Sequence, residues 1–150
     1  MHEIGHLVDA SFLKGNKPAT GENFSGFYDF DSPVGNDDRS SRFFKIAWTS
    51  EKERKAQARD LDFVSGYSMT DPFEDFAETY AYYRLHGAEF RKIISSSELL
   101  RQKYDFMKWY VFDGKDFGGD EDSKHLNIWQ RNYDVTILPY SLKNFLGLTS

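Results

Sequence analysis

The sequence contains no cysteine, which excludes disulfide bonds, catalysis by a thiol and any zinc site built on thiolate ligands. The compartment stays open, because exported proteins can also lack cysteine. Long apolar runs are missing too, so we expect no helix that spans a bilayer. There is no polybasic run, and the net charge of −5 argues against a nucleic-acid-binding surface.

Histidine is scarce, with four in the chain, yet two of them flank a glutamate in the opening segment Met1-His2-Glu3-Ile4-Gly5-His6. This H-E-x-x-H spacing puts His2 and His6 on one face of a helix, where two imidazoles can share one Zn²⁺. Glu3 then projects beside the metal, in the place of a general base that takes a proton from a water. The alternative is a surface helix with two unrelated histidines.

The spacing of charged and apolar residues predicts a mainly helical chain, and 150 residues suffice for a single domain over 1–150 with a sizeable core. A first helix over 1–13 would bury Ile4, Leu7, Val8 and Phe12. A long loop follows from Lys14 to about Ser41, in which the run 36–38 is read as a solvated turn in preference to a calcium site. Further helical or short aromatic segments are expected at 42–48, 72–86, 88–94, 97–112 and 142–146.

A third metal ligand is expected on the helix predicted for 72–86, which begins at Thr70-Asp71-Pro72. Glu74 and Glu78 lie one turn apart on this helix, where two like charges are unfavourable unless a cation compensates them. One carboxylate would bind zinc and the other would accept a hydrogen bond from a ligand histidine. The alternative is two ordinary acids that face solvent. Ala77 and Ala81 beside this stripe would let another helix approach.

These residues resemble a known family. The H-E-x-G-H motif, a tyrosine at position 67 and the run Glu74-Asp75-Phe76-Ala77-Glu78 seven residues further on are similar to the gluzincin metallopeptidases, and more narrowly to the lethal factor catalytic domain and the Pro-Pro endopeptidases. The resemblance covers about residues 1–86.

The resemblance implies zinc ligation by His2, His6 and Glu74, with Glu3 as the general base. Tyr67 would donate a hydrogen bond to the oxyanion, and Glu78 would hold a zinc histidine from behind. It also implies a peptide or protein substrate, and it favours an exported or cell-envelope location. The alternative reading of Tyr67 is an unremarkable tyrosine before a helix cap.

The position of the motif at residue 2 carries a further expectation. Zincins place a sheet upstream of the H-E-x-x-H helix, and only Met1 precedes His2 here. We therefore expect the C-terminal helical lobe of a zincin-like metallopeptidase, with the upstream sheet missing, and poor cleavage by this part alone. The competing hypothesis is a non-catalytic zinc-binding or helical interaction module.

Three other residues are not expected to bind the metal. Asp9 stands three residues after His6 and is expected to be an acid on the helix surface, with a supporting role beside the metal as the alternative. His86 and His125 are expected to be structural or exposed, and His86 would lie at a helix C-terminus, where a cation is favoured.

Overall fold

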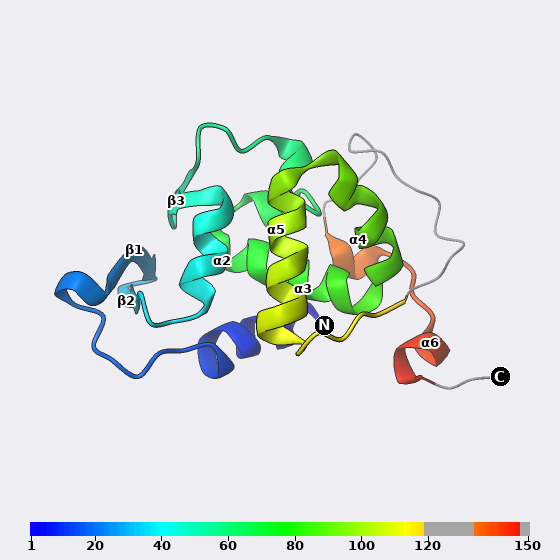
Figure 1. Ribbon diagram of the computed structural model, residues 1–150, viewed down its shortest axis with the longest axis horizontal. Helices are drawn as coiled ribbons and strands as arrows, with labels where there is room; N and C mark the ends of the chain where they lie inside the picture. The colour runs from blue at the N-terminus through cyan, green and yellow to red at the C-terminus, as the bar shows by residue number, and fades with distance from the viewer. Residues whose placement is uncertain (119–133, 148–150) are drawn as a thin grey trace.

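The computed structural model describes residues 1–118 and 134–147. In these ranges the chain is mainly helical, as the sequence predicts, and its strands are short. Helices α2, α3 and α5 lie side by side in the middle of the molecule, and a hairpin lies at one end (Figure 1). The α-helices are α1 (His2–Leu7), α2 (Ser40–Ala47), α3 (Pro72–Leu85), α4 (Gly87–Ile93), α5 (Glu98–Phe106) and α6 (Leu142–Leu146).

Short helical turns extend or connect these helices. Two are π-helical continuations of α1 and α5, namely η1 (Val8–Phe12) and η6 (Met107–Val111). The others are 3₁₀ turns, which are η2 (Gly21–Asn23), η3 (Asp60–Asp62), η4 (Tyr67–Met69), η5 (Ile94–Ser96) and η8 (Val135–Ile137). The predicted helices over 1–13, 72–86, 88–94, 97–112 and 142–146 are thereby confirmed, and the segment 42–48 is mostly the helix α2.

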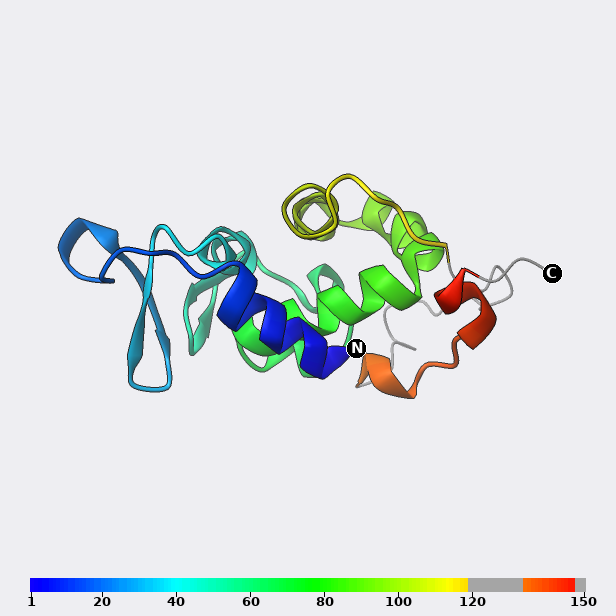
Figure 2. The same ribbon diagram turned by 90° about the horizontal axis from the view of Figure 1, so that it is seen from below.

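The predicted core face of the first helix is wrong. Ile4, Leu7 and Phe12 are 42%, 62% and 79% exposed, and only Val8 packs partly against the core. The buried face carries His2 and Gly5 instead, because this is the side on which α1 lies along α3 (Figure 2). The apolar pattern was misleading because the side of α1 that faces α3 carries a histidine and a glycine in place of large apolar side chains.

The predicted loop from Lys14 to Ser41 is also wrong over part of its length. Strands β1 (Phe24–Asp29) and β2 (Ser32–Gly35) pair as an antiparallel hairpin with an irregular register. Gly26 has a φ of +95° and Phe30 in the turn has a φ of +53°, so the strands lack the regular alternation by which a hairpin is predicted. A second small sheet pairs β3 (Trp48–Ser50) with β4 (Glu53–Arg54).

The acidic turn at 36–38 holds the preceding loop against the hairpin. Asp37 accepts hydrogen bonds from the backbone N–H groups of Asn16 and Lys17, at 2.8 and 2.9 Å, and from the Asn23 amide at 2.7 Å. These bonds lower the pKa of Asp37, the one from Asn23 most. The Asp37 carboxylate thus stabilises the turn by hydrogen bonds to the loop that precedes the hairpin.

Helix α3 is the central element, and its start is set by local chemistry. The Asp71 carboxylate accepts hydrogen bonds from the N–H groups of Phe73 and Glu74, and Pro72 occupies the first helical position. Most of the helix is buried because α1, α2, α4 and α5 all contact it. The core around it is aromatic, with Phe43, Phe44, Phe76, Tyr83, Phe90 and Phe106 among its fully or nearly fully buried members.

A buried ion pair joins α3 to α5. The Lys103 ammonium lies 2.7 Å from one oxygen of Asp75 and 2.9 Å from the other, and both side chains are fully buried. It also donates to the carbonyl of Asp62, and the Trp48 indole donates to Asp75 at 3.0 Å. Since Asp75 follows Glu74, this pair fixes the rotation of α3 and so the direction in which Glu74 points.

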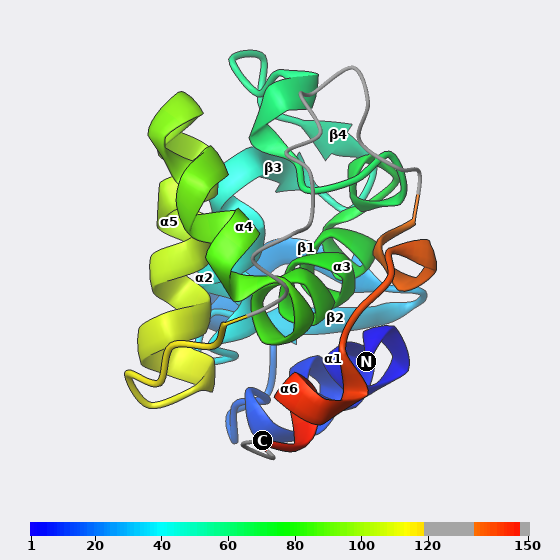
Figure 3. The same ribbon diagram turned by 90° about the vertical axis from the view of Figure 1, so that its right-hand side faces the viewer.

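Residues 134–147, the last part of the chain that the structure describes, lie against α3. The turn η8 packs against α3, and α6 lies below it in the view of Figure 3. We call residues 134–147 the C-terminal segment. A search for a helix long and apolar enough to cross a bilayer finds none in 1–118 or 134–147.

Candidate metal centre

The site forms where α1 meets α3, and one glycine permits the meeting. A Cβ atom added to Gly5 would lie 2.8 Å from the Ala77 Cα and 3.1 Å from its carbonyl oxygen. Such contacts are closer than carbon atoms tolerate, so only glycine lets the backbones approach this closely. Ala77 is itself fully buried and small. The closeness of the two helices brings the histidines of α1 over the acidic stripe of α3.

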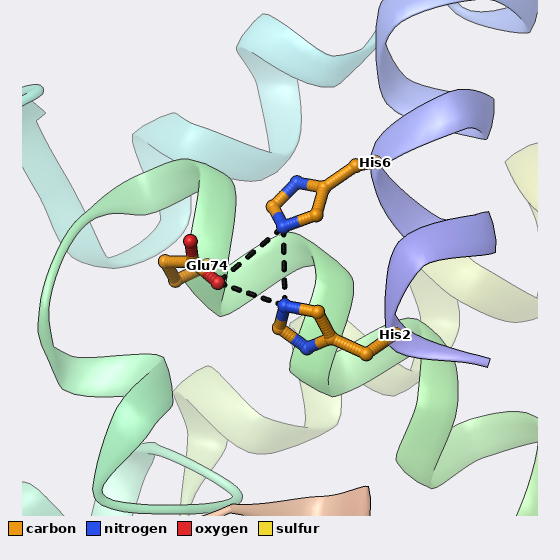
Figure 4. A group of neighbouring side chains, drawn as sticks. All are labelled: His2, His6 and Glu74. Atoms are coloured by element: carbon orange, nitrogen blue, oxygen red, sulfur yellow. Dashed lines mark hydrogen bonds and ion pairs between the residues drawn. The ribbon is translucent and has the colours of Figure 1, made fainter.

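Three candidate ligand atoms converge at this crossing. The distance from His2 Nε2 to Glu74 Oε2 is 2.9 Å, that from His6 Nε2 to Glu74 Oε2 is 3.4 Å, and the two Nε2 atoms are 3.1 Å apart (Figure 4). His2 is buried, whereas His6 and Glu74 are partly open to solvent. The structure therefore brings together the three residues that the sequence nominated as ligands.

The orientation of His2 is set from behind by Glu78. Glu78 Oε1 lies 2.7 Å from His2 Nδ1, and the Glu78 side chain is fully buried. A carboxylate only accepts, so Nδ1 carries the proton of this bond. In the neutral ring Nε2 then keeps a lone pair, and that lone pair faces His6 and Glu74.

The spacing fits a zinc-sized cation. Metal bonds of 2.0–2.1 Å in a tetrahedron place neighbouring ligand atoms about 3.3 Å apart, close to the three distances found here. Moreover, Glu74 Oε2 is buried yet accepts no hydrogen bond from any group in the described part of the chain. A buried carboxylate oxygen without a donor is costly, and a cation among these three atoms would remove that cost.

Glu3 occupies the solvent side of the same crossing. It is exposed, and it lines an open cleft of about 570 Å³ together with His6 and Glu74. The hairpin also lines this cleft, with Tyr28 and Phe30. A carboxylate in this position can exchange protons with a molecule in the cleft, because the Glu3 side chain is exposed to solvent.

Tyr67 lies beside the innermost histidine. Its ring stacks on that of His2, with centroids 5.5 Å apart and planes 17° from parallel. The turn that carries it is tied by reciprocal bonds between Ser65 and Ser68, since each backbone N–H donates to the other hydroxyl at 3.1 Å. The structure thus places all six residues nominated from the sequence, Tyr67 included, around one crossing of α1 and α3.

Asp9 is not the surface acid that the sequence suggested. It is buried on the inner face of η1 and is not a member of the His2, His6 and Glu74 group. Burial raises its pKa to about 7, against the opposing hydrogen bond from Ser40, and the nearby Asp29 and Asp38 raise it further. The helix pattern failed here because the hairpin and the acidic turn lie over this face, and no local pattern shows where they pack.

The remaining histidines lie apart from the crossing or outside the described residues. His86 is buried at the end of α3 and lies against the ring of Tyr82, with centroids 5.5 Å apart. His125 falls outside the described ranges.

Two groups that support the site had no sequence signal. The Ser65 hydroxyl donates to Glu78 Oε2 at 2.6 Å, and the Val135 backbone N–H donates to the same oxygen at 2.8 Å. Neither a lone serine nor a backbone amide 57 residues away from Glu78 forms a sequence pattern that would identify it. Only the folded chain shows that they belong to the site.

No protein-family model, curated protein or solved structure matches this chain. What the protein does therefore has to be inferred from the chemistry of the crossing between α1 and α3.

Proposed function

We propose that this chain is the metal-binding lobe of a zinc-dependent endopeptidase of the gluzincin type. One observation carries the proposal: His2 Nε2, His6 Nε2 and Glu74 Oε2 converge within 3.4 Å at the edge of a cleft that Glu3 also lines. Two neutral nitrogen ligands with one carboxylate and an open side are typical of catalytic zinc sites. The H-E-x-G-H motif and the downstream Tyr67 support the same assignment.

Zinc bound in this site would lower the pKa of a water and polarise the carbonyl of a peptide bond. The other tasks fall to side chains of the chain itself. Glu3 accepts the proton of the attacking water and delivers it to the leaving amine, which requires a solvent-accessible carboxylate beside the ligands. His2 and His6 keep their Nε2 atoms directed at one point, the former because Glu78 holds its Nδ1 proton.

Tyr67 is assigned the hydrogen bond to the developing oxyanion. Its ring is held against His2 by the Ser65–Ser68 turn, so that its position relative to the ligands is preset. A donor placed in advance stabilises the transition state without reorganisation at the moment of reaction. The hairpin wall with Tyr28 and Phe30 offers an apolar surface for an extended peptide along the cleft.

The alternative proposal is a zinc-binding or helical module that recognises a partner without cleaving it. It is favoured by exposed apolar side chains, since Phe30 is 97% and Phe12 is 79% exposed. Exposed apolar residues mark interaction surfaces where they gather into a patch. The two proposals share the metal and differ only in whether Glu3 performs chemistry.

The test separates metal binding from catalysis. The purified chain is dialysed against zinc, its metal content is measured, and cleavage of a mixed peptide library is followed by mass spectrometry. We expect one zinc per chain and slow, metal-dependent cleavage, and Glu3→Gln should keep the zinc but lose at least about 100-fold in rate, as expected for a general base. Glu98→Gln, which alters an exposed carboxylate on α5, is the matched control.

The outcomes are distinct. Absence of bound zinc at micromolar concentration overturns both proposals for the site. Stoichiometric zinc with cleavage by Glu3→Gln at the wild-type rate removes the assigned role of Glu3. Stoichiometric zinc without any cleavage by the wild-type chain favours the binding module.

A further inference from the structure

The carboxylate of Glu78 accepts hydrogen bonds from three separate segments of the chain. Its Oε1 accepts a hydrogen bond from His2 Nδ1–H at 2.7 Å, and its Oε2 accepts from the Ser65 hydroxyl at 2.6 Å and from the Val135 N–H at 2.8 Å. The side chain is fully buried, so water does not replace a lost partner easily. Each donor therefore contributes to the orientation of the carboxylate.

The Val135 donor belongs to the C-terminal segment, and the local turn presents it. Asp134 has extended backbone angles and caps η8 by accepting from the Thr136 N–H at 2.7 Å. The Val135 side chain is 1% exposed and joins the core, which brings its N–H to the buried face of α3. The amide reaches Glu78 only while this turn is docked on α3.

A second attachment holds the same segment further along α3. The Arg84 guanidinium lies 4.3 Å from the centroid of the Phe117 ring and 4.2 Å from that of the Phe145 ring, and it donates to the Phe145 carbonyl at 2.9 Å. The cation–π contact with Phe145 and the hydrogen bond to its carbonyl tie α6 to the helix that carries Glu78. The segment is thus fixed to α3 at two points, one of them directly behind the metal ligand His2.

We propose that the C-terminal segment positions the candidate metal ligand His2 through the hydrogen bond from the Val135 N–H to Glu78, so that docking of the segment and metal binding strengthen each other. The inference rests on the metal site proposed above. Partners behind a ligand histidine contribute strongly to metal affinity because they fix the direction of the ring. Coupling of this kind is reciprocal, so bound metal must in turn stabilise the docked segment.

The sharpest variant is Val135→Pro, which removes one N–H and little else. Val135 is the first residue of a 3₁₀ turn and follows an extended residue, both of which proline accepts. Val135→Ala is the matched control, because it keeps the N–H and removes buried side-chain volume. Affinity for Zn²⁺ is measured by competition with a chromophoric chelator, and the metal-free variants are compared by chemical denaturation.

We expect Val135→Pro to weaken zinc binding about tenfold, the lower end of the range for partners of a metal-binding histidine. Val135→Ala should change it by less than about threefold, since the donor remains. The inference is overturned if both variants bind zinc like the wild type, or if Val135→Ala weakens binding as much as Val135→Pro. Failure of the wild-type chain to bind zinc is a different result, which removes the metal site itself.

A measurement on the unmodified chain gives an independent answer. Zinc should slow hydrogen exchange of the Val135 amide, because the docked state becomes more stable. The Leu100 amide, which donates to the Ser97 hydroxyl at the start of α5, is the internal reference. Equal slowing at both amides would indicate general stabilisation, and unchanged exchange at Val135 would contradict the coupling.

Discussion

Two neighbouring carboxylates on α3 have opposite surroundings. Asp75 faces the core, where Lys103 and Trp48 donate to it. Glu74 faces the cleft, where Oε2 meets two histidine nitrogens and accepts no hydrogen bond from the described residues. The chain supplies its own cation for the first carboxylate, and we propose that a metal ion from outside is the partner of the second. The comparison contrasts a structural charge with a candidate binding site on the same turn of helix.

The largest effect should follow from removing the cation of the core pair. Lys103→Met leaves Asp75 buried without its charge partner, and breaking such a pair costs about 3–5 kcal/mol. Urea denaturation measures the loss. Asp75→Asn in the same chain should restore part of it, because the amide oxygen still accepts from Trp48 and no charge remains buried.

The exposed pair of Arg101 and Glu98 provides the control. The two side chains are 51% and 70% exposed, and Arg101→Met should cost less than about 1 kcal/mol, as is usual for a surface ion pair. An equal loss from Lys103→Met and Arg101→Met would contradict the contrast between a core pair and a surface pair.

Glu74, the carboxylate that faces the cleft, should contribute little to stability and much to zinc binding. Glu74→Gln should leave the metal-free protein about as stable as the wild type, because within 1–118 and 134–147 no hydrogen bond to Oε2 is lost. It should weaken zinc binding at least 100-fold, which is about 2.7 kcal/mol. Thermal unfolding with and without zinc shows both effects: the metal should raise the melting temperature of the wild type and of Glu98→Gln, and leave that of Glu74→Gln unchanged. Clear loss of metal-free stability would make Glu74 a structural residue like Asp75.

Asp9 extends the contrast to a buried carboxylate that forms no ion pair with any residue in 1–118 or 134–147. Its folded-state pKa of about 7 lies above the value of about 4 in an unfolded chain, so the folded protein binds this proton more tightly. Its contribution is therefore fully favourable below about pH 4, declines as the pH rises to about 7, and is constant above. Asp9→Asn should remove this decline.

At pH 8 we expect Asp9→Asn to be more stable than the wild type by about 2 kcal/mol. The displaced pKa corresponds to about 4 kcal/mol at 1.36 kcal/mol for each pH unit, and a buried amide keeps a cost of about 2 kcal/mol. Denaturation of both proteins from pH 4 to pH 8 measures this difference in the free energy of unfolding. Asp31→Asn on the exposed hairpin turn is the control, and a parallel pH dependence in Asp9→Asn and the wild type would refute the role of burial.

Local patterns in the sequence were sufficient for much of the helical architecture. The cap at Asp71 and Pro72, the serine at position 97 and the i, i+4 spacings of His2 with His6 and Glu74 with Glu78 all depend on residues within one or two turns. Such features can be predicted from the sequence because helix capping and helical periodicity depend on residues that are close in the chain. The same locality made the buried side of α1 hard to predict, since it depends on what α3 presents to it.

The sequence by itself determined which residues can bind a metal and on which helices they lie. The tertiary structure alone decided that the two helices meet at Gly5 and Ala77, that Glu74 turns to the cleft while Asp75 turns to the core, and that Ser65 and Val135 hold Glu78 in place. The physical reason is that these contacts join groups distant in the chain. Their formation depends on packing of the whole core, which no short pattern encodes.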